Sequence, residues 1–196
     1  IGGDKTMSAK IYCIMSLLPQ NGSKYLATNL GYFLNTIKKG KKILLIDFDF
    51  ENPVLCHHYA KESIYSIDNL VPIGENLNEN SFKRYIFETK LGFDVLKGTN
   101  TKKSDFFSKE LIAKILNISK EIYDYVFIVT NSDIKSSATI ITLLNANEVI
   151  LVIKNNYANN LKISETLMKI NTFIRKKMTI GVVINFVNYS KGINIL

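Results

Sequence analysis

Short runs of almost wholly apolar residues recur along the chain and alternate with stretches in which apolar residues follow a helical spacing. The apolar runs cover residues 10–16, 43–46, 93–96, 125–129, 149–153 and 180–185. A run that is apolar at every position, and not at every second one, predicts a strand that is covered on both faces. The pattern therefore predicts buried strands separated by other elements.

Amphipathic stretches lie between these runs. Residues 24–39 predict a helix with one apolar stripe, and Gly40 follows it as a natural C-terminal stop. Ser108 can cap a second helix through its side chain, and residues 134–145 predict a third. A fourth helix is predicted where apolar residues share one face, at Ile163, Leu167, Ile170 and Ile174.

Strands that alternate with amphipathic helices form right-handed crossovers and a parallel sheet. The expected fold class is therefore α/β, a mostly parallel twisted sheet with helices on both faces, in one domain over residues 1–196. Residues 51–90 are expected to hold loops and one or two short helices. Ligands of such sheets bind beyond the carboxyl ends of the strands, so the residues that follow each strand are the functional candidates.

The turn after the first strand, residues 17–22, leads directly into a helix. Such a turn favours anions, because free backbone N–H groups and the helix dipole both point at it. A P-loop adds glycines that let the backbone wrap phosphates, a lysine for their charge, and Ser or Thr for magnesium. Only Gly22 represents the glycines here. The candidate cofactor-binding residues of this turn are Asn21, Gly22, Ser23, Lys24 and Tyr25.

Two carboxylates, Asp47 and Asp49, follow the second strand. Side chains alternate along a strand, so residues two apart can point the same way. Beside a phosphate site such a pair could hold a hydrated magnesium ion or orient an attacking water. The alternative is a helix cap or a loop carboxylate on a solvated edge, and the pair taken alone favours neither interpretation.

Other polar clusters carry less chemistry. No carboxylate directly follows the strand that ends at Val129, because Asp133 lies four residues further on. His57 and His58 lack partners at metal-ligand spacing, so surface or loop histidines are favoured over a zinc site. Asn185 ends the last strand, where an asparagine commonly forms a turn.

Composition narrows the class of protein. A chain of 196 residues with 46% hydrophobic residues suits one soluble globular domain. No stretch of 18 or more apolar residues predicts a transmembrane helix, and the N-terminus lacks the layout of a signal peptide. Cys13 and Cys56 show no CxxC spacing, so we expect no disulfide framework and a cytoplasmic location.

The net charge of +8 indicates an anionic partner, either nucleic acid or anionic lipid. Short basic clusters lie at residues 38–42 and 175–177. The alternative interpretation is that each cluster follows a helix, where cations complement the negative end of the helix dipole. We consider that alternative the commoner explanation for each cluster.

Residues 16–30 and 41–53 together resemble the MinD/ParA family of deviant Walker P-loop ATPases. Members typically read S-x-K-G-G-x-G-K-T-T-x-A-x-N-L and, after a helix, K-x-V-L-L-I-D-x-D-x-x-x-P. The positions that match these patterns are Ser16, Gly22, Ala27, Asn29 and Leu30 in the first, and Asp47, Asp49 and Pro53 in the second.

The resemblance continues in order along the chain. Residues 92–98 are similar to the family's G-L-x-V-L-P-G, residues 123–129 to Y-D-x-I-I-I-D, and residues 145–152 to A-D-E-V-L-L-V. Residues 181–185 are similar to G-V-V-x-N, whose Asn commonly reads the adenine. The family thus implies ATP and magnesium as cofactors. It implies an adenine contact for Asn185, a catalytic role for Asp49, and a contact of Asp47 with the metal through water.

Departures from the family concentrate in the phosphate loop. Without gaps, the signature lysine falls on Leu18, the P-loop lysine on Ser23 and the magnesium-ligating Thr on Lys24. The aspartate of the third motif falls on Val129. A one-residue insertion would restore Lys24 as the P-loop lysine, but it would place Tyr25 at the magnesium position, where a phenol is a poor substitute.

These losses predict little or no ATP hydrolysis. Magnesium and the P-loop lysine supply most of the charge stabilisation in phosphoryl transfer. One electrostatic donor is already worth about 10²–10³ in rate, so the loss of several together is severe. Weak nucleotide binding through backbone amides and Asn185 is compatible with the sequence.

Atypical phosphate loops within the family resemble the TadZ/CpaE-like branch, whose members usually carry an extra N-terminal domain and place pilus-assembly machinery at a cell pole. The leading hypothesis is a degenerate ATPase domain that acts as a localisation or scaffold factor. It would form a homodimer and bind proteins of a secretion, pilus or partition machinery. The abrupt start at Ile1 and the short segment after Asn185 predict truncation at either end.

Two alternatives accompany this hypothesis. One is a nucleic-acid-associated plasmid partition or conjugation protein of the ParA type, which the charge of +8 favours. The other is an active ATPase with an atypical P-loop.

Overall fold

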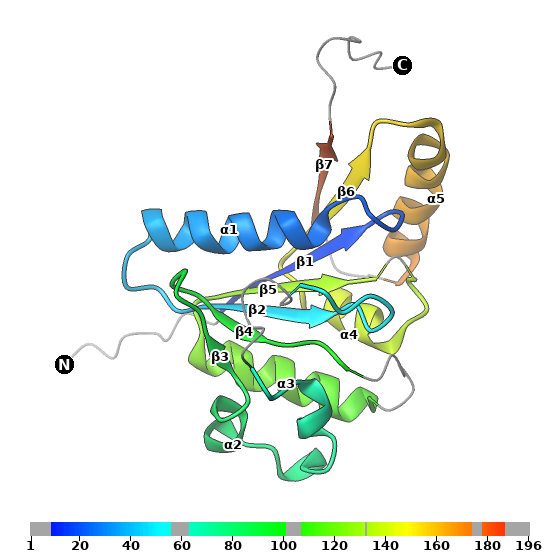
Figure 1. Ribbon diagram of the computed structural model, residues 1–196. Helices are drawn as coiled ribbons and strands as arrows, with labels where there is room; N and C mark the ends of the chain where they lie inside the picture. The colour runs from blue at the N-terminus through cyan, green and yellow to red at the C-terminus, as the bar shows by residue number, and fades with distance from the viewer. Residues whose placement is uncertain (1–8, 56–62, 101–106, 132, 174–177, 187–196) are drawn as a thin grey trace, which may run out of the picture.

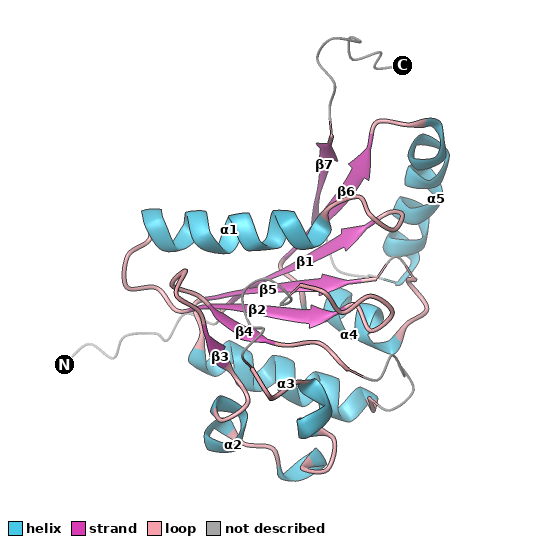
Figure 2. Ribbon diagram, viewed as in Figure 1, coloured by secondary structure: helices cyan, strands magenta, loops and turns pink. Residues whose placement is uncertain are grey.

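The apolar runs form the strands of a single sheet in the computed structural model, which describes residues 9–55, 63–100, 107–131, 133–173 and 178–186 (Figures 1 and 2). The strand order across the sheet is β3-β4-β2-β5-β1-β6-β7. The strands are β1 (Lys10–Ser16), β2 (Ile43–Phe48), β3 (Phe87–Glu88), β4 (Asp94–Leu96), β5 (Tyr125–Thr130), β6 (Glu148–Lys154) and β7 (Thr179–Asn185).

Every neighbouring pair in this sheet is parallel except β3 and β4, which run antiparallel. The order of strands across the sheet differs from their order in the sequence. Parallel strands are therefore linked by crossover connections that contain helices. Helices cover both faces, as Figure 2 shows. The prediction of a mostly parallel α/β sheet with helices on both faces is confirmed.

Helix α1 (Ser23–Ile37) lies on one face of the sheet, where it covers apolar side chains that include Ile14, Leu45 and Val129. The opposite face is covered by α3 (Lys109–Ile122), α4 (Ser137–Asn145) and α5 (Tyr157–Phe173). Burial of both faces explains why the strands carry continuous apolar runs. No described helix is long and apolar enough to span a membrane.

The predicted elements agree closely with the observed ones. The first helix was expected over residues 24–39 and is observed over Ser23–Ile37. Ser108 caps α3 as predicted, since its hydroxyl accepts a hydrogen bond of 3.1 Å from the backbone N–H of Leu111. Ile174, His57 and His58 lie outside the described residues, so the expectations for them concern positions that the structure does not describe.

Residues 51–90 were predicted to hold loops and one or two short helices, and the structure shows additional short elements there. These residues contain the 3-10 helices η1 (Ile67–Leu70) and η2 (Gly74–Asn76), the short helix α2 (Glu79–Lys83), and the antiparallel strand β3. Each is too short for a period of 3.6 or 2 to stand out. Asn78 and Ser81 form a capping box at the start of α2, a local signal that marks that helix.

Strand order brings the functional candidates together. β5 lies between β1 and β2, and the register pairs Met15 with Thr130 on one side and Phe48 with Thr130 on the other. The carboxyl ends of the three strands are therefore level with one another. The turn after β1, the loop after β2 and the loop after β5 meet at this edge of the sheet.

The turn between β1 and α1 packs tightly against β7. Gly22 has φ +94°, a left-handed backbone conformation that glycine adopts without strain. A Cβ atom on Gly22 would collide with the amide nitrogen of Asn185. Glycine is therefore favoured by the backbone angle, and an added Cβ would force the Asn185 side chain to move from its bond with the turn.

Gly22→Ala should destabilise the fold by more than Gly40→Ala. Gly40 has a similar left-handed φ of +79°, but a Cβ there would meet nothing within 4 Å. The Gly40 variant should therefore lose only about 1–2 kcal/mol for the backbone conformation. The Gly22 variant should lose a further 1–3 kcal/mol, roughly the cost of overpacking. Urea unfolding of both variants measures the difference, and equal losses would show that β7 does not press on the turn.

Candidate functional site

The turn after β1 presents backbone donors at the start of α1. Gly22 is the N-cap, and no side chain accepts a hydrogen bond from the first turn of the helix. The first turn also carries no acidic residue. Backbone N–H groups at a helix start attract anions, and the dipole adds to this attraction. The turn is therefore a candidate anion site.

Asparagine side chains hold this turn in place. The Asn21 amide donates to the backbone oxygen of Val152 at 3.0 Å and to Oδ1 of Asn159 at 2.7 Å. The Asn185 amide in turn donates to the backbone oxygen of Asn21 at 2.9 Å. Asn21 and Asn159 are both buried. These contacts tie the turn to β6, α5 and β7, so in this conformation the amides of Asn21 and Asn185 support the loop.

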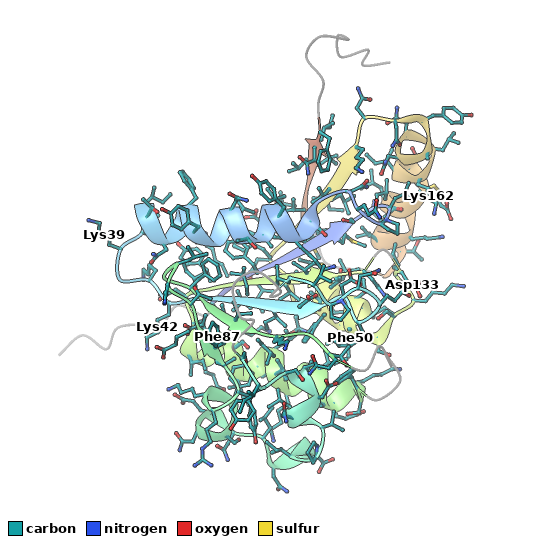
Figure 3. The ribbon with its side chains drawn as sticks, in the orientation of Figure 1. Lys39, Lys42, Phe50, Phe87, Asp133 and Lys162 are labelled. Carbon is teal, nitrogen blue, oxygen red and sulfur yellow. The ribbon has the colours of Figure 1, made fainter. Side chains whose placement is uncertain are left out.

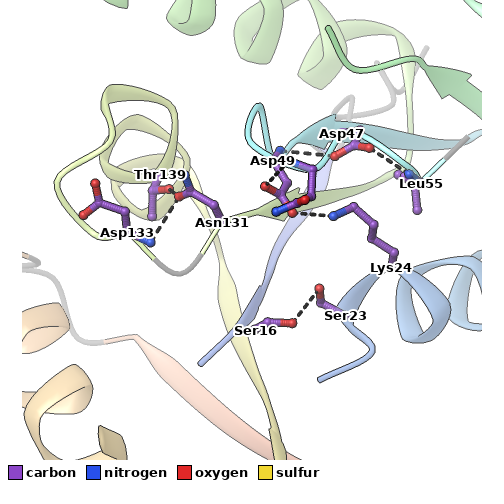
Figure 4. A network of polar contacts seen from close by, with 10 residues as sticks. Ser16, Ser23, Lys24, Asp47, Asp49, Leu55, Asn131, Asp133 and Thr139 are labelled. Atoms are coloured by element: carbon purple, nitrogen blue, oxygen red, sulfur yellow. Dashed lines mark hydrogen bonds and ion pairs between the residues drawn. The ribbon is translucent and has the colours of Figure 1, made fainter. Parts of the chain in front are cut away.

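Lys24, the second residue of α1, points across to the loop that follows β2. Its ammonium group forms an ion pair with Oδ2 of Asp49, as Figure 4 shows. The two side chains are only 18% and 12% exposed. An ion pair that is this well shielded is screened much less by salt than one on the surface. The pair therefore connects α1 to the end of β2.

Asp47 lies deeper than Asp49 and bonds only to backbone donors. Its Oδ1 accepts from the N–H of Asp49 at 3.1 Å, and its Oδ2 accepts from the N–H of Leu55 at 2.9 Å. Burial raises the pKa of Asp47 to about 7, although the nearby Lys24 ammonium and the bond from Leu55 act in the opposite direction. Asp47 thus shapes the loop after β2.

A cavity of about 270 Å³ opens at this edge of the sheet. It lies between the turn after β1 and the loops after β2 and β5. It is lined by residues of the turn, of both loops and of the adjacent strand ends: Ser16, Pro19, Gln20, Gly22, Ser23, Lys24, Asp49, Glu51, Asn52, Val54, Thr130 and Asn131. The cavity is large enough for a small anionic group.

The candidate residues divide into three groups around this cavity. Gly22, Ser23, Lys24 and Asp49 line it directly. Asn21, Asp47 and Asn185 lie outside its lining and support the turn and the β2 loop. Tyr25 is 69% exposed and is not part of the lining. Tyr25 thus differs from the other four residues predicted at the turn, because its side chain is exposed.

The helix start determines where each side chain of the phosphate loop points. Because α1 begins at Ser23, Lys24 occupies the second helical position, where the ungapped comparison places the family's magnesium-ligating Thr. The hydroxyl of Ser16 donates to that of Ser23 at 2.8 Å. Ser23 therefore bonds back to the end of β1.

The loop after β5 contributes the amide side chain of Asn131. Oδ1 of Asn131 accepts from the hydroxyl of Thr139 at 3.0 Å and from the backbone N–H of Asp133 at 3.2 Å (Figure 4). Within the described residues, no three His, Cys, Asp or Glu side chains group as metal ligands would.

Sequence patterns left several of these positions unassigned. Asn159 lies in α5, far from the turn in sequence, and no motif connects it with Asn21. Asn131 was noticeable only as a residue after a strand. The available signal was the general rule that ligands bind at the carboxyl ends of parallel strands, which indicates the loops but not the partners of each side chain.

Basic side chains gather at the opposite end of the sheet. Lys38 and Lys39 follow α1, and Lys42 precedes β2 (Figure 3). All three are exposed. Lys41 lies among them and pairs with Asp124 at 2.8 Å, and this hydrogen bond raises the pKa of Lys41. This basic cluster is therefore separated from the cavity by the length of the sheet, and residues 174–177 lie outside the described part.

The buried carboxyl group of Asp47 makes stability depend on pH. Its folded pKa is about 7, above the value of about 4 for an unfolded aspartate. The folded state thus binds the proton more tightly than the unfolded state does. The resulting contribution of Asp47 to the free energy of unfolding is complete below pH 4 and is lost as the pH rises through 7. Between pH 5 and 8, the Asp47 contribution should decrease the free energy of unfolding by about 2 kcal/mol.

Asp47→Asn should remove that part of the pH dependence while it also weakens the bond to Leu55. Urea unfolding at several pH values, compared with the exposed control Asp133→Asn, measures the slope of each protein. A slope in Asp47→Asn equal to that of the parent would show that Asp47 titrates normally.

No protein-family model and no curated protein sequence matches the chain. Several solved structures are similar to it in fold. A ParA family ATPase from Chlorobium tepidum TLS is similar with a TM-score of 0.79 at 14% sequence identity, over 90% of this chain and 73% of that chain.

Two further structures contain a nucleotide or its analogue. A putative plasmid partition protein from Borrelia burgdorferi B31, bound to AMPPNP, has a TM-score of 0.71 at 22% identity, over 92% of this chain and 76% of that chain. Cobyrinic acid a,c-diamide synthase from Mycobacterium smegmatis, with ADP and magnesium, has a TM-score of 0.71 at 11% identity, over 93% and 76%. The chain therefore has the fold of the MinD/ParA-type P-loop ATPases.

Proposed function

We propose that this chain is a degenerate ATPase domain of the MinD/ParA type that positions or scaffolds a partner and hydrolyses little or no ATP. The proposal treats residues 1–196 as a single domain. Its main support is the ion pair between Lys24 and Asp49. Asp49 is the candidate catalytic carboxylate. Its Oδ2, which could otherwise orient an attacking water, is bonded to the ammonium group of Lys24.

The remaining groups at the cavity strengthen this proposal. Phosphoryl transfer depends on cations that stabilise the developing charge. Ser23 begins α1 at the position where the family pattern has its lysine, and Val129 occupies the position of the family's third-motif aspartate. Each change removes a charged group from the site. Together they leave a cavity that could accept a nucleotide but is poorly equipped to cleave it.

Nucleotide-bound structures with this fold support ATP as a ligand class, since the Borrelia burgdorferi partition protein carries AMPPNP. We propose that ATP, where it binds, contacts the turn at residues 21–25 and reaches toward Asn185. A role as a homodimeric localisation factor for secretion, pilus or partition proteins, of the TadZ/CpaE-like kind, fits a domain that keeps the fold and has lost catalytic groups. It would act in the cytoplasm or at a cell pole.

Steady-state turnover of ATP with magnesium should be indistinguishable from that of Asp49→Ala and of Asp49→Asn. The reason is that Asp49 already pairs with Lys24 and cannot act as a base or orient water. A coupled phosphate-release assay measures all three proteins at equal concentration. Turnover that is at least tenfold above both variants would identify an active ATPase with an atypical P-loop and overturn the proposal.

A second candidate function is that of a nucleic-acid-associated partition protein. The basic cluster of Lys38, Lys39 and Lys42 is exposed at one end of the sheet, and the net charge is +8. Plasmid partition proteins are among the structures with this fold. Sequence-independent binding to DNA consists largely of phosphate neutralisation by such lysines.

Retention on duplex DNA should decrease about tenfold or more between 50 and 200 mM salt if this second function holds, because each released counterion contributes to the affinity. The Lys38→Gln/Lys39→Gln variant should bind more weakly. Its matched control is Lys83→Gln/Lys169→Gln, which removes two exposed lysines that already pair with Glu79 and Glu165. Absence of retention at low salt would reject DNA binding.

A further inference from the structure

The oxygens of the two aspartates after β2 already have partners within the protein. Oδ1 of Asp49 accepts from the backbone N–H of Asn52 at 3.2 Å, and its Oδ2 pairs with Lys24. Both oxygens of Asp47 accept backbone N–H groups. A divalent cation at Asp49 would therefore have to displace an ammonium group or a backbone donor.

The neutral oxygens are engaged in the same way. The hydroxyls of Ser16 and Ser23 bond to each other at 2.8 Å. Oδ1 of Asn131 accepts from Thr139 and from the backbone of Asp133. Magnesium keeps several of its own waters and is usually bound through one or two carboxylates together with phosphate oxygens. The lining carboxylate next to Lys24 is Asp49, whose two oxygens are both engaged, and the other lining carboxylate, Glu51, is exposed in the loop after β2.

We propose that the ammonium group of Lys24 takes the place of a divalent cation in this cavity, so that the site excludes magnesium and accepts a nucleotide without it. This inference rests on the proposed function in so far as the cavity is treated as a nucleotide site. The main support for this inference is the position of Lys24. The second residue of α1 points toward Asp49, as a magnesium-ligating Thr would point toward its metal.

An ammonium group can serve both partners that the metal would bridge. It carries three N–H donors, and the pair with Asp49 uses one of them. The others can reach an oxygen of a bound phosphate at the start of α1, because Lys24 and the turn line the same cavity. A second cation beside Lys24 would meet its charge at close range, and the shielding of the pair would strengthen that repulsion.

The exposed lysine at the other end of the same helix provides a matched control. Lys38 follows α1 and lies outside the lining of the cavity. Lys24→Thr and Lys38→Thr remove the same charge and add the same hydroxyl, one inside the site and one outside it. Lys24→Met removes the charge without adding a ligand, and it replaces Lys24→Thr should that variant fail to fold.

Manganese, titrated alone and followed by electron paramagnetic resonance, tests the exclusion directly. The parent and Lys38→Thr should show no saturable Mn²⁺ site up to millimolar concentration. Lys24→Thr should gain a site whose dissociation constant is at least tenfold below that limit. Adding Asp49→Asn to Lys24→Thr should abolish the gain. Two results would overturn the inference. One is that the parent binds Mn²⁺ and loses this binding on Asp49→Asn substitution. The other is that neither Lys24 variant, once shown to be folded, gains Mn²⁺ binding.

Calorimetry with AMPPNP tests the consequence for nucleotide binding. The affinity of the parent should agree within about twofold in excess EDTA and in excess magnesium, and that of Lys24→Thr should rise at least tenfold with magnesium. Dependence of the parent on magnesium would refute the inference and leave the proposed function intact. Turnover that depends on Asp49 would refute the proposed function instead, so the two failures differ. If AMPPNP does not bind the parent at all, the manganese result decides.

Discussion

A lysine on α1 and an aspartate after β2 form the contact on which the candidate site depends. The ion pair between Lys24 and Asp49 joins the helix that follows the turn after β1 to the strand end that carries the paired carboxylates. Both partners are largely shielded from water. Breaking the pair would leave a charge with little solvation, which is costly in such surroundings. The pair therefore holds the turn and the β2 loop in one relative position.

The neighbouring polar groups support the same arrangement. Asp47 organises the loop after β2 through two backbone bonds, and Asn21, Asn159 and Asn185 attach the turn to β6, α5 and β7. Protein groups thus hold the turn after β1 and the loop after β2 in place.

Much of the fold was predictable from the sequence, whereas the site was predictable only in outline. The continuous apolar runs identified the parallel strands, and the Ser108 cap was recognised correctly. The short elements between residues 51 and 90 were not resolved, because two to five residues carry no period. For the site, the sequence indicated the correct strand ends but not that Lys24 would pair with Asp49, since a shift of one helical position turns a side chain by about 100°.

The sequence by itself determined that the sheet is mostly parallel and covered on both faces, and which charged groups of the family pattern are absent from the turn after β1. These properties depend on local composition and spacing. Only the tertiary structure decided which groups meet, because the partners come from distant segments. Asn21 bonds to Asn159 and Asn185, and the exposed Tyr25 points away from the cavity. Such contacts follow from the strand order and from the residue at which α1 begins, and neither is encoded in any single motif.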